Sequence, residues 1–350
     1  MKKVDSIIVR MPNWIGDFIM ATPILHDLRS HYPEAEITAM CQESLAPLLE
    51  AESSVDELLS FRPCRKLLFF GGEKPVVTTL KSGRYDLGIL LTNSFSSAWK
   101  FSQGQIKKTI GYRGDWRSAL LTDPLPFPEK KKSQHLVLTY KELLTPLKIP
   151  ISTTPPSINI KESEIEEAWE YVKQFDIKPS QTIIGINPGA AYGSAKCWLP
   201  DRFHEVGKRL LEKDPCAVLL LFGDSSQYEL TSSICEGLGK RALNLAGQTS
   251  LRELAALIKL CSVILTNDSG PMHLADALDV PLVALFGSTS PILTGPYKQR
   301  ESVIQKKVPC APCFKRRCPI DFPCMKKIET EEVLSLLLSK IEPRSRKASC

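Results

Sequence analysis

Small, hydroxylated and charged residues follow several apolar runs of the chain, in patterns that suit a phosphate-bearing ligand. Asp268, Ser269 and Gly270 come directly after the run "SVILTN", and Pro271 favours the start of a helix there. Backbone N–H groups at a helix N-terminus attract anions, and small side chains let phosphates approach closely. The segment predicts a diphosphate site that includes His273. The alternative is an ordinary helix cap followed by a structural histidine.

A second glycine-rich segment, "NPGAAYGSAKCWLP", follows the apolar run "TIIGI". It contains Gly189, Ser194 and Lys196, and a lysine on such a loop can act as a point charge against phosphate. Alanine and cysteine flank the lysine, so the Gly-Lys-Ser/Thr ending of an NTPase P-loop is absent. No G-x-G-x-x-G fingerprint follows the first strand of either half, which excludes the usual dinucleotide dehydrogenases. With a further glycine turn at Gly223, the pattern predicts a nucleotide-type ligand.

A carboxylate stands at the turn out of the first apolar run, in "MPNWIGDFIMATP". Asp17 follows Asn13, Trp14 and Gly16 and begins a stretch with helical spacing. The dipole of a helix N-terminus favours the ionised form, which can accept a proton, although the same placement weakens the base. Asp17 is thus a candidate general base, and the alternative is an N-cap aspartate. Pro23 marks a competing helix start.

Four cysteines near the end of the chain have the spacing C-x2-C-x4-C-x5-C. Cys310, Cys313, Cys318 and Cys324 could enclose a tetrahedral structural zinc, or they could be reduced thiols that pack a loop. The basic residues 315–317 lie between them. A zinc-stabilised basic protein that binds nucleic acid or another partner is therefore the alternative from outside the enzymes.

Buried strands that alternate with helices must position these segments. The first half predicts four strands and the second half five, in an α/β pattern typical of doubly wound parallel sheets. Ligands of such sheets lie beyond the carboxyl ends of the strands, where the segments above are found. The predicted strands are 6–11, 36–41, 85–92, 109–113, 182–187, 217–222, 242–245, 262–267 and 281–286. Helical stretches are predicted at 17–32, 43–51, 161–175, 201–213, 250–260 and 329–342, and a Pro-rich connector at 122–157.

The bulk composition fits an enzyme of two domains. The 350 residues are 43% hydrophobic and 24% charged, which excludes a disordered chain except at the tail 343–350. A net charge of +6 suits an anionic partner or is an ordinary surface charge. No apolar run approaches the roughly 20 residues of a membrane span, and no signal peptide is recognised. We therefore expect a cytoplasmic protein with reduced thiols.

Taken together and in order, these segments resemble the heptosyltransferases of the lipopolysaccharide inner core, which use ADP-heptose, and most of all their type II branch. The segments that carry the resemblance span most of the chain: "RMPNWIGDFIMATP", "GYRGDWRSALLTD", "NPGAAYGSAKCWLP", "TNDSGPMHLADAL", "VALFGSTSP" and "CAPCFKRRCPIDFPCM". The resemblance implies the GT-B fold, two Rossmann-like domains facing a central cleft. The expected domains are an acceptor domain at 1–175, a donor domain at 176–328, and a final segment at 329–350 that packs back on the first.

The resemblance also implies the reaction. Heptose is transferred with inversion from ADP-L-glycero-β-D-manno-heptose to heptosyl-Kdo2-lipid A, without a metal or other cofactor. The enzyme would work at the anionic inner face of the inner membrane and bind no nucleic acid. Type I and type III heptosyltransferases, which use other acceptors, remain alternatives.

The matching motifs assign roles to individual residues. Asp17 corresponds to the catalytic carboxylate. The donor residues are Gly189, Ser194, Lys196, Gly223, Asp268, Ser269, Gly270 and His273. The acceptor residues are Asn13, Trp14, Gly16, Arg113 and Arg117, with Asp115 beside them, and Lys130, Lys131 and Lys132 would face the membrane or solvent. One departure concerns the ribose: the family usually has a glutamate where this chain offers Gln227 first and Glu229 later.

Overall fold

The computed structural model describes residues 3–62, 74–114, 116–128 and 133–341. The chain forms two compact units, the first ending at Asn159 and the second beginning at Ile160. Each unit is described by itself below. The predictions for Asp115, Lys130 to Lys132 and the tail 343–350 concern residues outside the described ranges.

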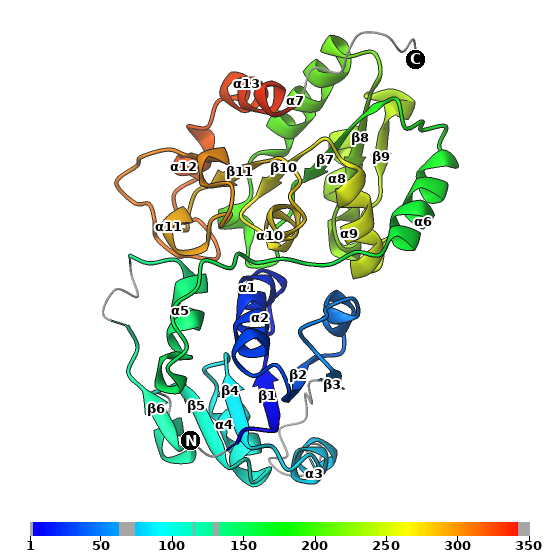
Figure 1. The fold of residues 1–350 in the computed structure, drawn as a ribbon. Helices are drawn as coiled ribbons and strands as arrows, with labels where there is room; N and C mark the ends of the chain where they lie inside the picture. The colour runs from blue at the N-terminus through cyan, green and yellow to red at the C-terminus, as the bar shows by residue number, and fades with distance from the viewer. Residues whose placement is uncertain (1–2, 63–73, 115, 129–132, 342–350) are drawn as a thin grey trace. The chain divides into compact units, whose positions relative to one another are not determined.

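The described part of the first unit contains a sheet of six parallel strands in the order β3-β2-β1-β4-β5-β6 (Figure 1). The strands are β1 (Ser6–Arg10), β2 (Glu36–Gln42), β3 (Glu57–Phe61), β4 (Leu87–Leu90), β5 (Lys108–Tyr112) and β6 (Asp123–Leu125). The strand order changes direction between β1 and β4, so the loops after these two strands diverge and leave room for a ligand.

Helices cover both faces of this sheet. Those that pack together on one face are α1 (Ile15–Met20), α2 (Thr22–His31) and α5 (Leu136–Glu142). Those on the other are α3 (Lys74–Ser82) and α4 (Phe95–Gln103), above an apolar core that includes Leu80, Leu90 and Phe101 (Figure 1). Helices begin near both of the predicted starts, Asp17 and Pro23. The chain turns at Ala21, which separates α1 from α2.

The described part of the second unit repeats this architecture, with six parallel strands in the order β12-β11-β10-β7-β8-β9 (Figure 1). The strands are β7 (Thr182–Asn187), β8 (Ala217–Leu221), β9 (Ala242–Asn244), β10 (Val263–Asn267), β11 (Leu282–Phe286) and β12 (Val303–Gln305). Here the order changes direction between β7 and β10.

The helices of the second unit again lie on both faces of its sheet. Those that pack together on one face are α7 (Pro200–Lys213), α8 (Tyr228–Cys235) and α13 (Thr330–Lys340). Those on the other are α9 (Leu251–Leu260) and α10 (Gly270–Ala277), with α6 (Glu162–Lys173) packed on α9. The short helices α11 (Pro291–Thr294) and α12 (Pro323–Lys326) lie in the segments that follow β11 and β12. None of the described helices is both long and apolar enough to cross a bilayer.

The predicted α/β class and the nine predicted strands are confirmed, whereas three short edge strands, β3, β6 and β12, were not predicted. The segment 122–157, predicted as a connector, contains β6 and α5. The helix predicted at 43–51 is only a single 3-10 turn, Ala46–Leu49. Pro47 lies in its first positions, where the ring restricts the backbone and removes a donor.

The boundary between the units lies after Asn159 rather than after residue 175. The difference comes from α6, because Arg252 of α9 binds Glu164 of α6 with Nε 2.7 Å from Oε1. The final helix also belongs to the second unit. Val333 and Leu337 of α13 are buried in that unit's core, where α13 packs on α7. The described part of the predicted final segment, 329–341, thus packs within the second unit, and its packing back on the first unit stays a prediction.

The ion pair between α6 and α9 yields a stability prediction. The hydrogen bond from Arg252 holds the pKa of Glu164 below its ordinary value. The pair therefore stabilises the fold above that ordinary value, and the stabilisation is lost as the pH falls through the lowered native pKa. We expect Glu164→Gln to lower the free energy of unfolding by about 1 kcal/mol at neutral pH, and by less in acid, in urea titrations.

The matched control is Glu167→Gln, which removes an exposed carboxylate from the same helix. It should leave the free energy of unfolding unchanged at either pH. Equal stability of the two variants at neutral pH would show that the pair does not hold α6 on the second unit.

Candidate active site

The loops after β7 and β10 are joined by a buried side chain. Asn187, the last residue of β7, is 3% exposed, and its Nδ2 donates to Ser269 Oγ at 3.0 Å and to Gly189 O at 3.1 Å. The same nitrogen lies 3.3 Å from Thr266 Oγ1. One amide thus connects the glycine-rich loop to the segment that opens α10.

A second asparagine makes the reciprocal connection. Asn267, the last residue of β10, is fully buried, and its Nδ2 donates to Pro188 O at 2.6 Å. Its Oδ1 accepts from the backbone N–H of Trp198 at 3.0 Å. Sequence analysis missed both asparagines as site residues, although each ends a strand whose loop had been singled out. Their bonds satisfy backbone groups that the diverging loops leave without strand partners.

An ion pair lies within this loop pair. Lys196 Nζ is 2.6 Å from Asp268 Oδ2, and the two side chains are only 14% and 3% exposed. Thr289, on the loop after β11, donates its hydroxyl hydrogen to the same carboxylate oxygen at 2.5 Å. The structure therefore brings together the two charged residues that the sequence predicted, from segments far apart in the chain.

The opening of α10 is more than an ordinary cap. Ser269 occupies the N-cap position, but its side chain makes no cap hydrogen bond and instead contacts Asn187 and Thr266. Gly270 is the first helical residue, and His273 is buried within the helix. The backbone N–H groups at this helix start lie at the carboxyl edge of the sheet, where an anion is favoured.

The glycine turns after β7 and β8 lie beside Gln227, the first of the two residues considered for the ribose. A Cβ on Gly189 would lie 2.1 Å from Gln227 Oε1, and one on Gly223 would lie 2.8 Å from it. The Gln227 side chain thus lies against both turns. Glu229 is exposed in the first turn of α8, where it lines a surface pocket with Asn244. Gln227 is therefore the residue that accompanies the predicted donor loops. Ser194 is exposed in the turn that contains Lys196.

In the first unit, a buried arginine organises the loop after β1. Arg10, which is 5% exposed, donates from Nη2 to Asn13 Oδ1 at 2.6 Å and also donates to Met11 O. Its guanidinium lies 4.6 Å from the centre of the Phe61 ring. Burial lowers the pKa of Arg10 to about 10, so it remains a cation at neutral pH. Arg10 is a positioning residue that sequence analysis missed.

Asp17 lies in the first turn of α1, which begins after the exposed Trp14 at the N-cap. The Asp17 side chain is half-buried and Gly16 precedes it in the helix. Burial, together with the charge of Asp17, raises the pKa of Tyr140 on α5 well above its ordinary value. The Tyr140 phenol therefore stays protonated near Asp17.

The two predicted acceptor arginines differ in position. Arg113 is exposed, and its Nε donates to Pro124 O at 3.0 Å. Arg117 is fully buried, and its guanidinium donates to Thr92 O and Asn93 Oδ1, both at 2.6 Å. The buried Arg117 side chain therefore stabilises the loop after β4. Trp116, beside it, is 94% exposed.

The cysteine cluster gives no support to the zinc prediction. Cys324 is buried, which raises the pKa of its thiol, and Cys310 and Cys318 lie near enough to add to the shift. Within the described ranges, which include all four cysteines, no three cysteine, histidine or acidic side chains converge in a metal-binding arrangement.

Comparisons with known proteins identify the family. The model of glycosyltransferase family 9 (heptosyltransferase) matches residues 75–322. Lipopolysaccharide heptosyltransferase 2 of Escherichia coli K12 is 32% identical over 310 residues, which are 86% of this chain and 88% of that protein.

Solved structures agree with this assignment. The structure of E. coli ADP-heptose lipopolysaccharide heptosyltransferase II has a TM-score of 0.82 at 29% identity, covering 96% of this chain and 98% of that one. A family 9 glycosyltransferase from Veillonella parvula has a TM-score of 0.85 at 24% identity, covering 97% and 98%, and shows the same fold. The two sheets thus form a GT-B fold, and the nucleic-acid-binding alternative is not favoured. The chain is a glycosyltransferase and belongs to family 9, the heptosyltransferases.

Proposed function

We propose that this protein is a type II heptosyltransferase, which moves L-glycero-D-manno-heptose from ADP-heptose to heptosyl-Kdo2-lipid A during assembly of the lipopolysaccharide inner core. The observation that carries the proposal is the ion pair between Lys196 and Asp268 at the direction change of the second sheet. The likeness to heptosyltransferase 2 supports the type II acceptor.

The second unit binds the donor in this proposal. Lys196 and the backbone N–H groups at Ser269 and Gly270 bind the diphosphate, because a lysine and a helix start both favour phosphate charge. Asp268 then accepts hydrogen bonds from sugar hydroxyls through the oxygen that its ion pair leaves available. Gln227 contacts the ribose, and its amide can both donate and accept a hydrogen bond.

The donor loops also support the departure of ADP. When the bond from the anomeric carbon to phosphate breaks, negative charge grows on the diphosphate. Lys196 and the helix start are already in place to stabilise that charge, and they need no large rearrangement to do so.

The first unit supplies the base and binds the acceptor. Asp17 accepts the proton of the attacking hydroxyl while that oxygen bonds to the anomeric carbon, and one in-line displacement inverts the configuration. Asn13, held by Arg10, and the exposed Trp14 contact the acceptor beside Gly16.

Arg113 is exposed and binds the anionic groups of the acceptor, as a guanidinium suits phosphates and carboxylates. Arg117 is left out of these direct contacts because it is buried. The acceptor is a membrane lipid, so we further propose that the enzyme works as a peripheral protein at the anionic cytoplasmic face of the inner membrane.

The test of the function is a comparison of acceptors. The purified protein is incubated with ADP-heptose and either Kdo2-lipid A or heptosyl-Kdo2-lipid A, with and without EDTA, and the products are weighed by mass spectrometry. We expect one added heptose on the heptosylated acceptor only, at equal rates with and without EDTA.

Three results would contradict parts of this proposal. Transfer to Kdo2-lipid A instead would make the protein a type I enzyme. Transfer to neither acceptor would leave the type II activity without support. Loss of transfer in EDTA would show that the reaction needs a metal ion.

The role of Asp17 yields a separate prediction. Asp17→Asn keeps the size of the side chain but removes the basic carboxylate, so turnover should fall at least about a hundredfold. ADP affinity, measured by isothermal titration calorimetry, should stay the same because the donor site belongs to the other unit.

Glu34→Gln, which alters an exposed carboxylate of the first unit, is the control and should keep full turnover. Turnover of Asp17→Asn equal to that of the control would show that another group accepts the proton.

A further inference from the structure

The cysteine-rich loop between Cys310 and Cys318 has no role in the reaction as described so far, yet it is fastened to the donor loops. Tyr192 donates its hydroxyl hydrogen to Phe314 O at 2.8 Å. The backbone N–H of Phe314 donates to Ser288 O at 2.7 Å. The loop is thus bonded both to the glycine-rich segment after β7 and to the segment after β11.

The closest approach is at Arg316. The N–H of Ala195 donates to Arg316 O at 3.1 Å, directly beside Lys196. A Cβ at Gly193 would lie 2.3 Å from the same oxygen, and Gly193 has a φ of +149°. This position therefore requires glycine, and its absence of a side chain lets the backbone of Arg316 lie against the lysine loop.

The side chain of Arg316 is held near Lys196 through one aromatic ring. The guanidinium carbon of Arg316 lies 5.3 Å from the centre of the Tyr192 ring, and Lys196 Nζ lies 4.9 Å from it. Both distances are within the range of a cation–π interaction. Two cations that would repel each other in isolation thus share one ring, whose attraction for each offsets part of that repulsion.

The charges around this ring do not balance. Lys196 is already paired with Asp268, so this pair contributes no net charge. Arg316 is exposed, and among the residues that the structure describes it has no carboxylate partner.

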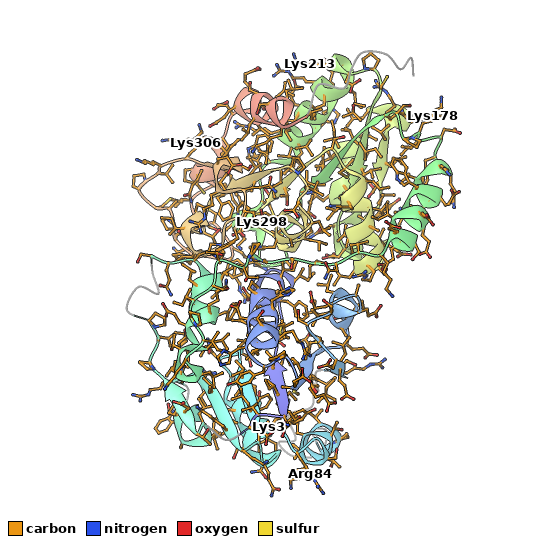
Figure 2. The ribbon with its side chains drawn as sticks, in the orientation of Figure 1. Lys3, Arg84, Lys178, Lys213, Lys298 and Lys306 are labelled. Carbon is orange, nitrogen blue, oxygen red and sulfur yellow. The ribbon has the colours of Figure 1, made fainter. Side chains whose placement is uncertain are left out.

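Two lysines of this unit, by contrast, are paired with carboxylates. Lys306, which projects outward in Figure 2, pairs with Glu332 at 2.6 Å, and Lys298 pairs with Asp279 at the same distance. Arg316 is therefore an available cation beside the donor loops.

We propose that Arg316 is a second diphosphate-binding cation of the donor site, positioned by Tyr192 beside Lys196. The inference rests on the proposed function, since it takes the ligand to be a nucleoside diphosphate. A guanidinium can donate two parallel hydrogen bonds to phosphate oxygens, and an ammonium cannot. As the leaving ADP gains negative charge, the contact with Arg316 becomes stronger and assists the departure.

The test measures ADP binding by isothermal titration calorimetry at low salt, in wild type and in Arg316→Gln, Arg316→Lys and Tyr192→Leu. We expect Arg316→Gln and Tyr192→Leu to weaken ADP binding about tenfold. Arg316→Lys should weaken it less, because a lysine keeps the positive charge but cannot donate two parallel hydrogen bonds to phosphate. Adenosine, tested as a competitor of ADP, should bind equally well to wild type and Arg316→Gln, because it lacks phosphates.

Arg317→Gln is the matched control, because it removes the neighbouring exposed arginine. Equal ADP affinity of Arg316→Gln and Arg317→Gln would overturn the inference, as would an equal loss of adenosine binding in Arg316→Gln. Failure of the wild type to bind ADP would instead contradict the proposed donor, and with it the inference. Thermal unfolding of each variant at the wild-type temperature would confirm that the exposed substitutions leave the fold intact.

Discussion

Two buried asparagines, Asn187 and Asn267, hold the donor loops together, and the rest of the site depends on them. Where a parallel sheet changes direction, the loops after the two central strands diverge, which makes room for a ligand but leaves their backbone groups without strand partners. Each asparagine reaches across to the other strand's loop: Asn187 donates to the Ser269 hydroxyl, and Asn267 satisfies the backbone groups Pro188 O and Trp198 N–H. The two loops are therefore held to each other by side-chain hydrogen bonds.

This constraint explains why the ion pair can form with both side chains mostly buried. Lys196 and Asp268 lie on different loops, and burying either charge alone would be costly. Because the loops are joined beneath them, the two side chains meet without a further loss of loop entropy. Thr289 adds a hydrogen bond to the carboxylate, which fixes its orientation. A preorganised charged pair of this kind suits a reaction in which charge develops on a leaving diphosphate.

Much of the fold could be predicted from the sequence because the central strands are buried on both faces. Runs such as residues 217–222 and 281–286 are continuously apolar, and such runs are recognisable without any partner. The edge strands β3, β6 and β12 were missed because they are short and half-exposed, so their residues show no such run. The position of α6 was also missed, since only the contact between Glu164 and Arg252, residues distant in sequence, assigns it to the second unit.

Part of the candidate site could be predicted because its residues follow recognisable strands. The loops that follow strands are recognisable by their glycines, hydroxyls and charges, so the sequence points to Asp17, Lys196 and Asp268 as candidates. What joins the loops could not be predicted, because the bond between Asn187 and Ser269 and the ring shared by Lys196 and Arg316 link distant segments. The burial of Arg117 also depends on tertiary packing. It could not be predicted, because the sequence around Arg117 resembles that of an exposed turn.

We propose that the loops joined by Asn187 and Asn267 bind the diphosphate of the donor. A crystal structure of the protein with ADP tests this binding site. We expect the diphosphate to lie within hydrogen-bonding distance of Lys196 Nζ and of the backbone N–H groups at the start of α10. ADP bound at another edge of the sheet, with the ion pair between Lys196 and Asp268 untouched, would contradict it.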